Sequence, residues 1–170
     1  VIEAVPEIMS LKQDTFKQLG EICKPDAILC TNTSSMSITE IMSQCKNPER
    51  CAGMHFFFPV MAMKLVEVIR GAHTSDETYK TIAELAAAIG KEPVEVNEAP
   101  GFVVNKILVP MINEGIDLVY TGVASVEGVD TAMKLGANHP MGPLALGDLI
   151  GLDVCLAIMD TLYDETHDPK

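Results

Sequence analysis

The sequence predicts an α/β protein in which a parallel sheet with covering helices is followed by an all-helical region. Short apolar segments alternate with helical patterns up to residue 97, and strand–helix–strand units of this kind need parallel strands joined by right-handed crossovers. The segment Asn97–Gly101 then breaks this rhythm, and no strand pattern follows it. We therefore expect a first domain over residues 1–97 and a helical domain over residues 98–170.

The expected strands are short apolar segments that are bounded by turn-forming or charged residues. They cover residues 1–5, 27–31, 51–54, 65–69 and 93–96. The first of these segments begins at residue 1, so we expect the chain to start inside a structural element.

The expected helices place apolar side chains on one face and carry residues suited to helix ends. They cover residues 7–23, a short stretch from residue 38, and residues 75–89, 102–120, 125–135 and 143–163. Ser37 or Thr39 can cap the second of them, Thr74 or Ser75 the third, and Ser125 the fifth. Pro110 should kink the helix in which it lies, and a break is expected near Gly151. Residues 164–170 are polar, and we expect no helix or strand there.

Composition limits the possible partners. The chain has 170 residues, 48% of them apolar, and a net charge of -12 without any cluster of basic residues longer than a pair. This argues against binding to nucleic acid or to an acidic membrane surface. The most apolar run, Met54–Met63, is too short to span a bilayer, and no signal peptide is visible at the start. We expect a cytoplasmic protein, whose five cysteines, lacking C-x-x-C spacing, bind no metal.

Three polar residues lie at places in the expected sheet where ligands bind. Ser34 follows the strand at 27–31, at the edge where open α/β sheets hold ligands, and His55 follows the strand at 51–54. Glu67 lies within the next strand. Each has a simpler interpretation, as a turn residue, a core histidine or a solvent-facing glutamate. Together they suit proton transfer, because histidine exchanges a proton near neutral pH and a carboxylate can orient its ring.

Five sequence blocks, in this order, resemble the L-3-hydroxyacyl-CoA dehydrogenase family, and most of all its bacterial 3-hydroxybutyryl-CoA branch. The blocks are NTSSMSITEI, NPERCAGMHFF, MKLVEVIRG, APGFVVNKIL and NHPMGPLALGDLIGLD. The resemblance covers nearly the whole chain. It implies that residues 1–97 are the C-terminal part of a Rossmann-like NAD-binding domain and residues 98–170 an incomplete domain for dimerisation and substrate binding.

The resemblance also implies an activity. The full-length protein would interconvert short-chain (S)-3-hydroxyacyl-CoA and 3-oxoacyl-CoA with NAD, or with NADP, as a homodimer. His55 and Glu67 match the family's catalytic pair, and Ser34 and Asn105 match residues that bind the substrate and take part in catalysis. The proposed task of Ser34 and Asn105 is to hold the substrate's C3 oxygen and thioester carbonyl.

Cofactor contacts are implied at Ala4, Glu7, Lys12, Ser34 and Phe58. From the residues alone, Glu7 could instead favour a helix start and Lys12 could cover a solvent face. Phe58 departs from the family pattern, because it stands where the family has an asparagine beside the nicotinamide ribose. A phenyl ring has none of the donors and acceptors of an amide, so we expect weaker cofactor binding or alignment.

No G-x-G-x-x-G segment follows a strand in these 170 residues, although dinucleotide-binding folds use such a loop to approach the pyrophosphate. The family carries this loop upstream, so we expect the chain to be truncated at both ends and the 170-residue polypeptide alone to be inactive. Two alternatives remain at this point. One is a catalytically silent fragment that retains a dimerisation module, and the other is a related dehydrogenase of free hydroxy acids or sugar acids.

Overall fold

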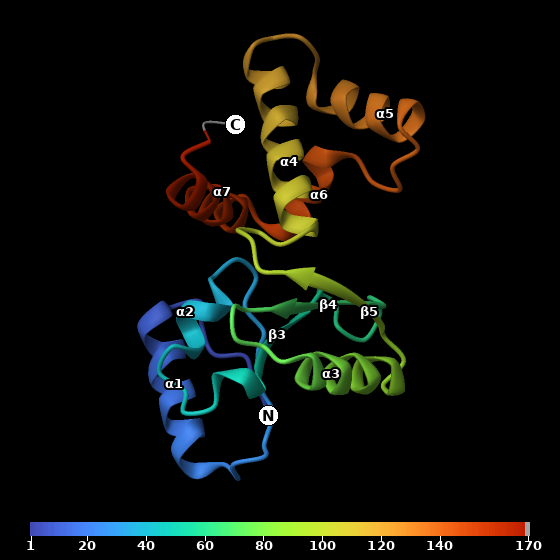
Figure 1. Cartoon of the computed structure of the whole chain (residues 1–170). Coiled ribbons are helices and arrows are strands. Elements are labelled where there is room, and N and C mark those ends of the chain that lie inside the picture. Colours follow the sequence, from blue (N-terminus) through green and yellow to red (C-terminus); the bar gives the residue numbers. More distant parts are fainter. Residues whose placement is uncertain (169–170) are drawn as a thin grey trace. The chain divides into compact units, whose positions relative to one another are not determined.

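The chain forms two compact units in a computed structural model that describes residues 1–168. The first unit is Val1–Phe102 and the second is Val103–Lys170. The division between the units falls after Phe102, in the segment that follows the last strand, whereas the sequence-based prediction put the domain boundary after residue 97. The predicted fold class is confirmed, because the first unit combines a sheet with helices and only helices occur in the described part of the second (Figure 1).

The strands of residues 1–168 form one five-stranded sheet in the order β1-β2-β3-β4-β5. They are β1 (Ile2–Glu3), β2 (Leu29–Thr31), β3 (Cys51–Phe56), β4 (Leu65–Arg70) and β5 (Glu92–Asn97). Neighbouring strands are parallel except for β3 and β4, which are antiparallel. The expectation of a parallel sheet is therefore wrong for this pair. Residues 57–64 between them contain no helix, and parallel strands need a crossover connection.

Helices cover both faces of the sheet (Figure 1). They are α1 (Met9–Ile22), α2 (Ile38–Met42) and α3 (Asp76–Ala88). Side chains alternate between faces along a strand, so Cys51 of β3 packs with α1 and α2, whereas Ala52 and Met54 pack with α3. His55, two residues from Gly53 and four from Cys51, shares the face that α1 and α2 cover.

Several helix starts agree with the capping residues read from the sequence. Ser37 accepts a hydrogen bond from the backbone N–H of Glu40 at the start of α2. Ser75 caps α3 in the same way, and Ser125 caps α5 (Val126–Gly136). A side-chain oxygen at this position satisfies one of the N–H groups that the first helical turn leaves unpaired.

The second unit consists of α4, α5, α6 and α7 in its described residues, and Figure 1 shows α5 and α7 on opposite sides of α4. The remaining bounds are α4 (Val104–Tyr120), α6 (Pro143–Ile150) and α7 (Leu152–Thr166). Its core contains Val109, Ile112, Cys155, Ile158 and Leu162. None of the helices within residues 1–168 is long and apolar enough to cross a membrane.

The end of the described chain differs from its expected structure. The break near Gly151 is confirmed, because this residue separates α6 from α7 with a φ of +103°. Residues 164–166, however, belong to α7 instead of lacking a helix. The helix ends at Thr166, and the next residue, His167, has a left-handed backbone and donates its N–H to the carbonyl oxygen of Tyr163 at 2.7 Å. Residues 169 and 170 of that expectation lie outside the described residues.

Candidate active site

The centre of the candidate site is a buried contact between His55 and Glu67. These residues lie directly opposite each other in the antiparallel pair β3–β4, so their side chains project from the same face of the sheet. His55 Nδ1 lies 2.7 Å from Glu67 Oε2, and the two side chains are 5% and 1% exposed. The structure thus brings together the histidine and the carboxylate that the sequence singled out.

The contact defines which ring nitrogen of His55 can take up a proton. An ionised carboxylate only accepts hydrogen bonds, so the nitrogen facing Glu67, Nδ1, carries the hydrogen and donates it. In the neutral ring the other nitrogen, Nε2, then has a free lone pair. The pair is therefore set up for Nε2 to accept a proton from a bound ligand.

Two aromatic rings bracket the imidazole of His55. The ring centroid of Phe57 lies 4.5 Å from that of His55, with an angle of 51° between the planes. Phe102 lies 5.7 Å away with an interplanar angle of 58°. Neither phenylalanine was singled out in the sequence as a site residue. Phe57 stands in the same sequence block as His55 and could have been suspected, whereas Phe102 stands in a different block, where nothing local connects it to the histidine.

The loop after β2 is attached to the end of β3. The side-chain oxygen of Asn32 accepts a hydrogen bond of 2.9 Å from the backbone N–H of Phe56. Thr33 donates its hydroxyl to Glu7 at 2.7 Å. Ser34, which follows directly, is half-buried. The first bond attaches the Ser34 loop to β3, which carries the histidine, and the second attaches it to the segment between β1 and α1.

Lys12 lies inside a buried polar cluster at the carboxyl end of β1. Its side chain is 0% exposed, and its Nζ lies 2.9 Å from Glu3 Oε1 and 3.7 Å from Glu7 Oε1. The ammonium also donates to the carbonyl oxygen of Val5 at 3.1 Å, and Glu3 accepts a hydroxyl hydrogen bond of 2.7 Å from Thr31. The simpler interpretation, a lysine covering a solvent face, is therefore wrong. Glu3 was missed, although a charged residue in an apolar strand is a recognisable signal.

This edge of the sheet has groups that fit a dinucleotide. Because β1 and β2 are parallel, the segments that follow them, with Ala4 and Glu7 after β1 and Ser34 after β2, leave from the same edge. Ala4 is exposed, and the Glu7 side chain is 41% exposed, so its carboxylate can accept hydrogen bonds from ligand hydroxyl or amide groups. Lys12 directs its ammonium toward protein oxygens, and its ion pair with Glu7 restrains the position of that carboxylate.

The other predicted site residues lie in different surroundings. Phe58 is 90% exposed in the loop after β3. That loop is held by Lys91, whose ammonium donates to the carbonyl oxygens of Val60 and Met63. Asn105 belongs to the second unit, where it is half-buried in the first turn of α4. Within residues 1–168, no group of three or more acidic, histidine or cysteine side chains is placed to hold a metal ion.

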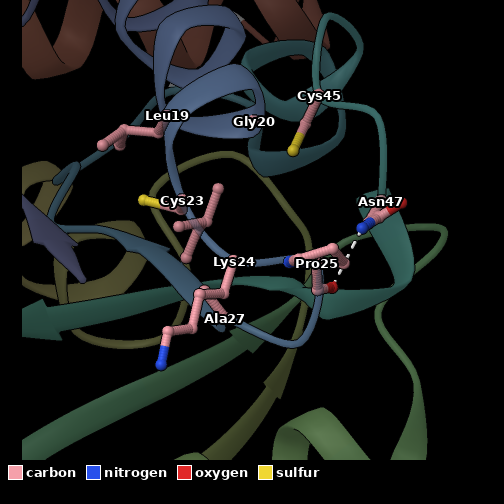
Figure 2. Close-up of a pocket in the computed structure, with 9 residues that line it drawn as sticks. Leu19, Gly20, Cys23, Lys24, Pro25, Ala27, Cys45 and Asn47 are labelled. Atoms are coloured by element: carbon pink, nitrogen blue, oxygen red, sulfur yellow. Dashed lines mark hydrogen bonds between the residues drawn. The ribbon is translucent and has the colours of Figure 1, made fainter.

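A small cavity lies away from this site, at the opposite ends of the strands (Figure 2). It is lined by Ala27 and Leu29 at the start of β2, by Asn47 before β3 and by Cys23 and Cys45. Asn47 closes one side with a hydrogen bond of 3.0 Å to the carbonyl oxygen of Pro25. The cavity measures about 20 Å³, which is room for about one water molecule. It therefore belongs to the packing of α1 on the sheet.

Comparison with known proteins gives matches along the whole chain. Residues 1–99 match the family model of the 3-hydroxyacyl-CoA dehydrogenase NAD binding domain, and residues 101–170 match that of the C-terminal domain. A 3-hydroxybutyryl-CoA dehydrogenase of Clostridioides difficile is 63% identical over 170 residues, which are 100% of this chain and 60% of that protein. The human mitochondrial hydroxyacyl-coenzyme A dehydrogenase is 46% identical over 96% of this chain and 52% of its own length.

A solved structure agrees with the fold described above. The crystal structure of (S)-3-hydroxybutyryl-CoA dehydrogenase from Ralstonia eutropha superposes with a TM-score of 0.97 at 50% identity. The match covers 99% of this chain and 60% of that one. The chain thus spans about three fifths of the length of these bacterial relatives.

Proposed function

The chain belongs to the 3-hydroxyacyl-CoA dehydrogenase family, and from this we propose that the full-length protein interconverts short-chain (S)-3-hydroxyacyl-CoA and 3-oxoacyl-CoA with NAD. 3-Hydroxybutyryl-CoA, named in several relatives, is the proposed substrate. The observation that carries the proposal is the buried hydrogen bond between His55 and Glu67. In this pair, the imidazole of His55 is the base that oxidation of an alcohol requires.

Oxidation of the substrate alcohol removes a hydride from C3 and a proton from the hydroxyl group. NAD, when bound, supplies the chemistry of hydride acceptance. His55 accepts the hydroxyl proton at Nε2, and in the reverse reaction it returns that proton. Glu67 keeps the hydrogen on Nδ1 and stabilises the positive charge that forms on the ring. The low exposure of both side chains, 5% and 1%, strengthens this interaction by excluding water.

The remaining predicted residues are proposed to bind and orient. Ser34 is proposed to hydrogen-bond the C3 oxygen, and Asn105 the thioester carbonyl, so that C3 faces the nicotinamide. Ala4 and Glu7 are proposed to contact the cofactor directly, with Lys12 fixing the carboxylate of Glu7. Ser34 would also contact the cofactor, since its loop leaves the same edge of the sheet as the end of β1.

A homodimer formed through the helical unit is part of the proposal. Apolar side chains in this unit remain exposed, among them Ile107, Tyr120 and Leu149 at 67%, 88% and 71%. Ile112 of the same helix, by contrast, is buried in the unit's own core. Exposed apolar area of this kind is typical of a surface that a second copy covers. Light scattering on the full-length protein should give twice the mass of one chain, and a monomer would contradict the proposal.

The cytoplasm is the proposed compartment. All five cysteines are free, as expected where glutathione and thioredoxin keep thiols reduced. Fractionation of the source cells should find the protein with cytoplasmic markers, and recovery in a secreted or membrane fraction would contradict the assignment.

The central test replaces His55 by asparagine in a polypeptide of the relatives' full length that contains this chain. The kcat for 3-hydroxybutyryl-CoA oxidation, followed by NADH absorbance, should fall by about 10²–10⁴-fold, the usual contribution of a general base. His73→Asn is the matched control, because His73 is exposed and has no proposed role. Equal activity of His55→Asn and the control would overturn the mechanism. An inactive wild-type enzyme would favour a catalytically silent protein, and activity on free hydroxy acids alone would favour a different substrate class.

A further inference from the structure

We propose that Phe102, the last residue of the first unit, is a positioning residue that holds the imidazole of His55 in its working orientation. The inference rests on the proposed function, in which His55 moves the proton. The carboxylate of Glu67 fixes one ring nitrogen, and the phenyl ring of Phe102 restrains the plane of the imidazole. A segment that follows the last strand would thereby form part of the catalytic machinery.

The first supporting observation is how Phe102 is buried. Its side chain is 4% exposed and belongs to the core cluster that also contains Phe16, Cys51 and Ile69. This cluster fills the same face of the sheet from which His55 projects. The ring of Phe102 lies 5.7 Å from the imidazole centroid, and Phe57 lies 4.5 Å from it. The two phenylalanines together limit rotation of the imidazole.

The second observation is the backbone of Phe102. Its φ is +53°, in the left-handed region that bulky residues rarely adopt, and it follows Gly101 with a φ of +72°. Its N–H donates a hydrogen bond of 3.0 Å to the carbonyl oxygen of Ala99. A glycine would adopt this turn without strain. Residues in such conformations persist where the surrounding structure holds them, and they cluster at active sites. The turn therefore points the phenyl ring at the histidine at a conformational cost.

The third observation is that the segment before Phe102 is itself anchored to the first unit. The carboxylate of Glu98 accepts hydrogen bonds from the Ser37 hydroxyl at 2.5 Å and from the Thr39 backbone N–H at 3.0 Å, and it also accepts one from the Thr39 hydroxyl. The N–H of Glu98 donates to the carbonyl oxygen of Arg70 at 3.0 Å. The short segment 98–102 is thus fixed at its first residue by Glu98 and at its last by the packed ring.

A comparison of Phe102→Leu with Phe16→Leu separates positioning from general packing. Phe16 is 0% exposed on α1 and belongs to the same core cluster, so both variants remove one buried ring from one cluster. Both should lower the Tm. The ¹⁵N shifts of the His55 ring, measured by NMR on the 170-residue chain, should indicate a single tautomer in wild type and in Phe16→Leu. In Phe102→Leu they should indicate a mixture of tautomers, with faster exchange of the Nδ1 proton with solvent.

Kinetics on the full-length enzyme provide the second readout. Phe102→Leu should lower kcat by about tenfold or more with KM changed less than about twofold, because the ring acts on orientation and not on substrate affinity. Phe16→Leu should keep kcat within about twofold at temperatures below its Tm. Phe102→Tyr should retain most of kcat because it keeps the aromatic ring. Phe102→Gly, which relieves the backbone and removes the ring, should be as slow as Phe102→Leu.

The proposal is overturned if His55 keeps one tautomer in Phe102→Leu, if Phe16→Leu has the same effect on its tautomer, or if Phe102→Gly has wild-type kcat. The failure of the proposed function would look different. In that case the His55→Asn enzyme would keep its activity, whereas the NMR comparison would still decide whether Phe102 positions the ring.

Discussion

Lys12 and Glu3 form an ion pair in the interior of the first unit, with Nζ 2.9 Å from Oε1 and side chains that are 0% and 2% exposed. Both partners are further satisfied, since Thr31 donates to the carboxylate of Glu3 and the ammonium of Lys12 donates to the carbonyl oxygen of Val5. Burying two charges is costly, and removing only one partner leaves the other uncompensated. The pair should therefore be sensitive to single substitutions.

The first prediction concerns stability. Lys12→Met should lower the free energy of unfolding by about 3–5 kcal/mol, because Glu3 keeps its buried charge without a partner. The double variant Glu3→Gln/Lys12→Met should be less destabilised than the sum of the two single variants. Lys17→Met on the same helix is the control, since Lys17 is exposed and should change stability by no more than about 0.5 kcal/mol. Urea unfolding of the wild type and the four variants, Glu3→Gln alone included, measures these differences, and equal effects at both lysines would contradict the prediction.

The second prediction concerns Glu67. In the full-length enzyme, Glu67→Gln should lower kcat by about 10²–10⁴-fold while KM changes little, because a neutral amide can donate a hydrogen bond to Nδ1 of His55, which favours the other tautomer, and it carries no charge to stabilise the protonated ring. Glu92→Gln, an exposed strand position in the same unit, should leave kcat unchanged. A Glu67→Gln enzyme with normal kcat would show that the 2.7 Å contact is structural only.

The third prediction concerns Phe58, which stands where the family has an asparagine. Phe58→Asn in the full-length enzyme should lower the KM for NAD about fivefold or raise kcat, because one net hydrogen bond is worth about 1 kcal/mol. The change should cost little stability, since Phe58 is 90% exposed. Met61→Asn in the same loop, at 95% exposure, is the control and should leave both constants unchanged. Unaltered kinetics of Phe58→Asn would count against a cofactor contact there.

The fourth prediction uses two glycines. A Cβ at Gly53 would lie 2.9 Å from Ile38 Cδ1 and 2.9 Å from Ile69 Cβ, so Gly53→Ala should destabilise the fold by about 1–3 kcal/mol through overpacking. Gly136 has no heavy atom within 4 Å of such a Cβ, and Gly136→Ala should be neutral or slightly stabilising. Thermal unfolding compares the two variants, and a Gly53→Ala variant with the wild-type Tm would contradict the prediction.

The fifth prediction concerns thiol reactivity. Burial raises the pKa of Cys30 to about 12, and burial together with the neighbouring Cys45 raises the pKa of Cys51. A raised pKa means less reactive thiolate at any given pH. Cys23 is the only one of the five cysteines that is not buried. At pH 8 a thiol reagent should label Cys23 first in the native protein, as peptide mass spectrometry can show. Earlier labelling of Cys51 would contradict its burial.

The sequence predicted most of the elements because their signals are local. The cap at Ser75 and the break at Gly151 depend on a few neighbouring residues, and both were found. The antiparallel direction of β4 relative to β3 was missed. It depends on the connection between them, because residues 57–64 contain no crossover helix. Strand direction is a property of the connection as well as of the strand, and apolar patterning carries no information about it.

The site was only partly predictable for a similar reason. His55 and Glu67 were found as residues, but their contact follows from a strand register that sequence patterns do not specify. The burial of Lys12 was missed because a lysine on a helix normally extends into solvent. Phe102 was missed because its importance lies in a left-handed turn and a long-range ring contact, and neither has a local signature.

His55 and Glu67 face each other because they are partners in the β3–β4 register. Their relative position therefore does not depend on the length of the loop that joins the two strands. Insertions or deletions in residues 57–64 would leave the two side chains facing each other, provided that the rungs themselves stay aligned. A slip of a single rung would instead turn one of the two toward α3. Evolution can therefore remodel this hairpin tip, and with it the surroundings of a ligand, without rebuilding the acid–base pair beneath it.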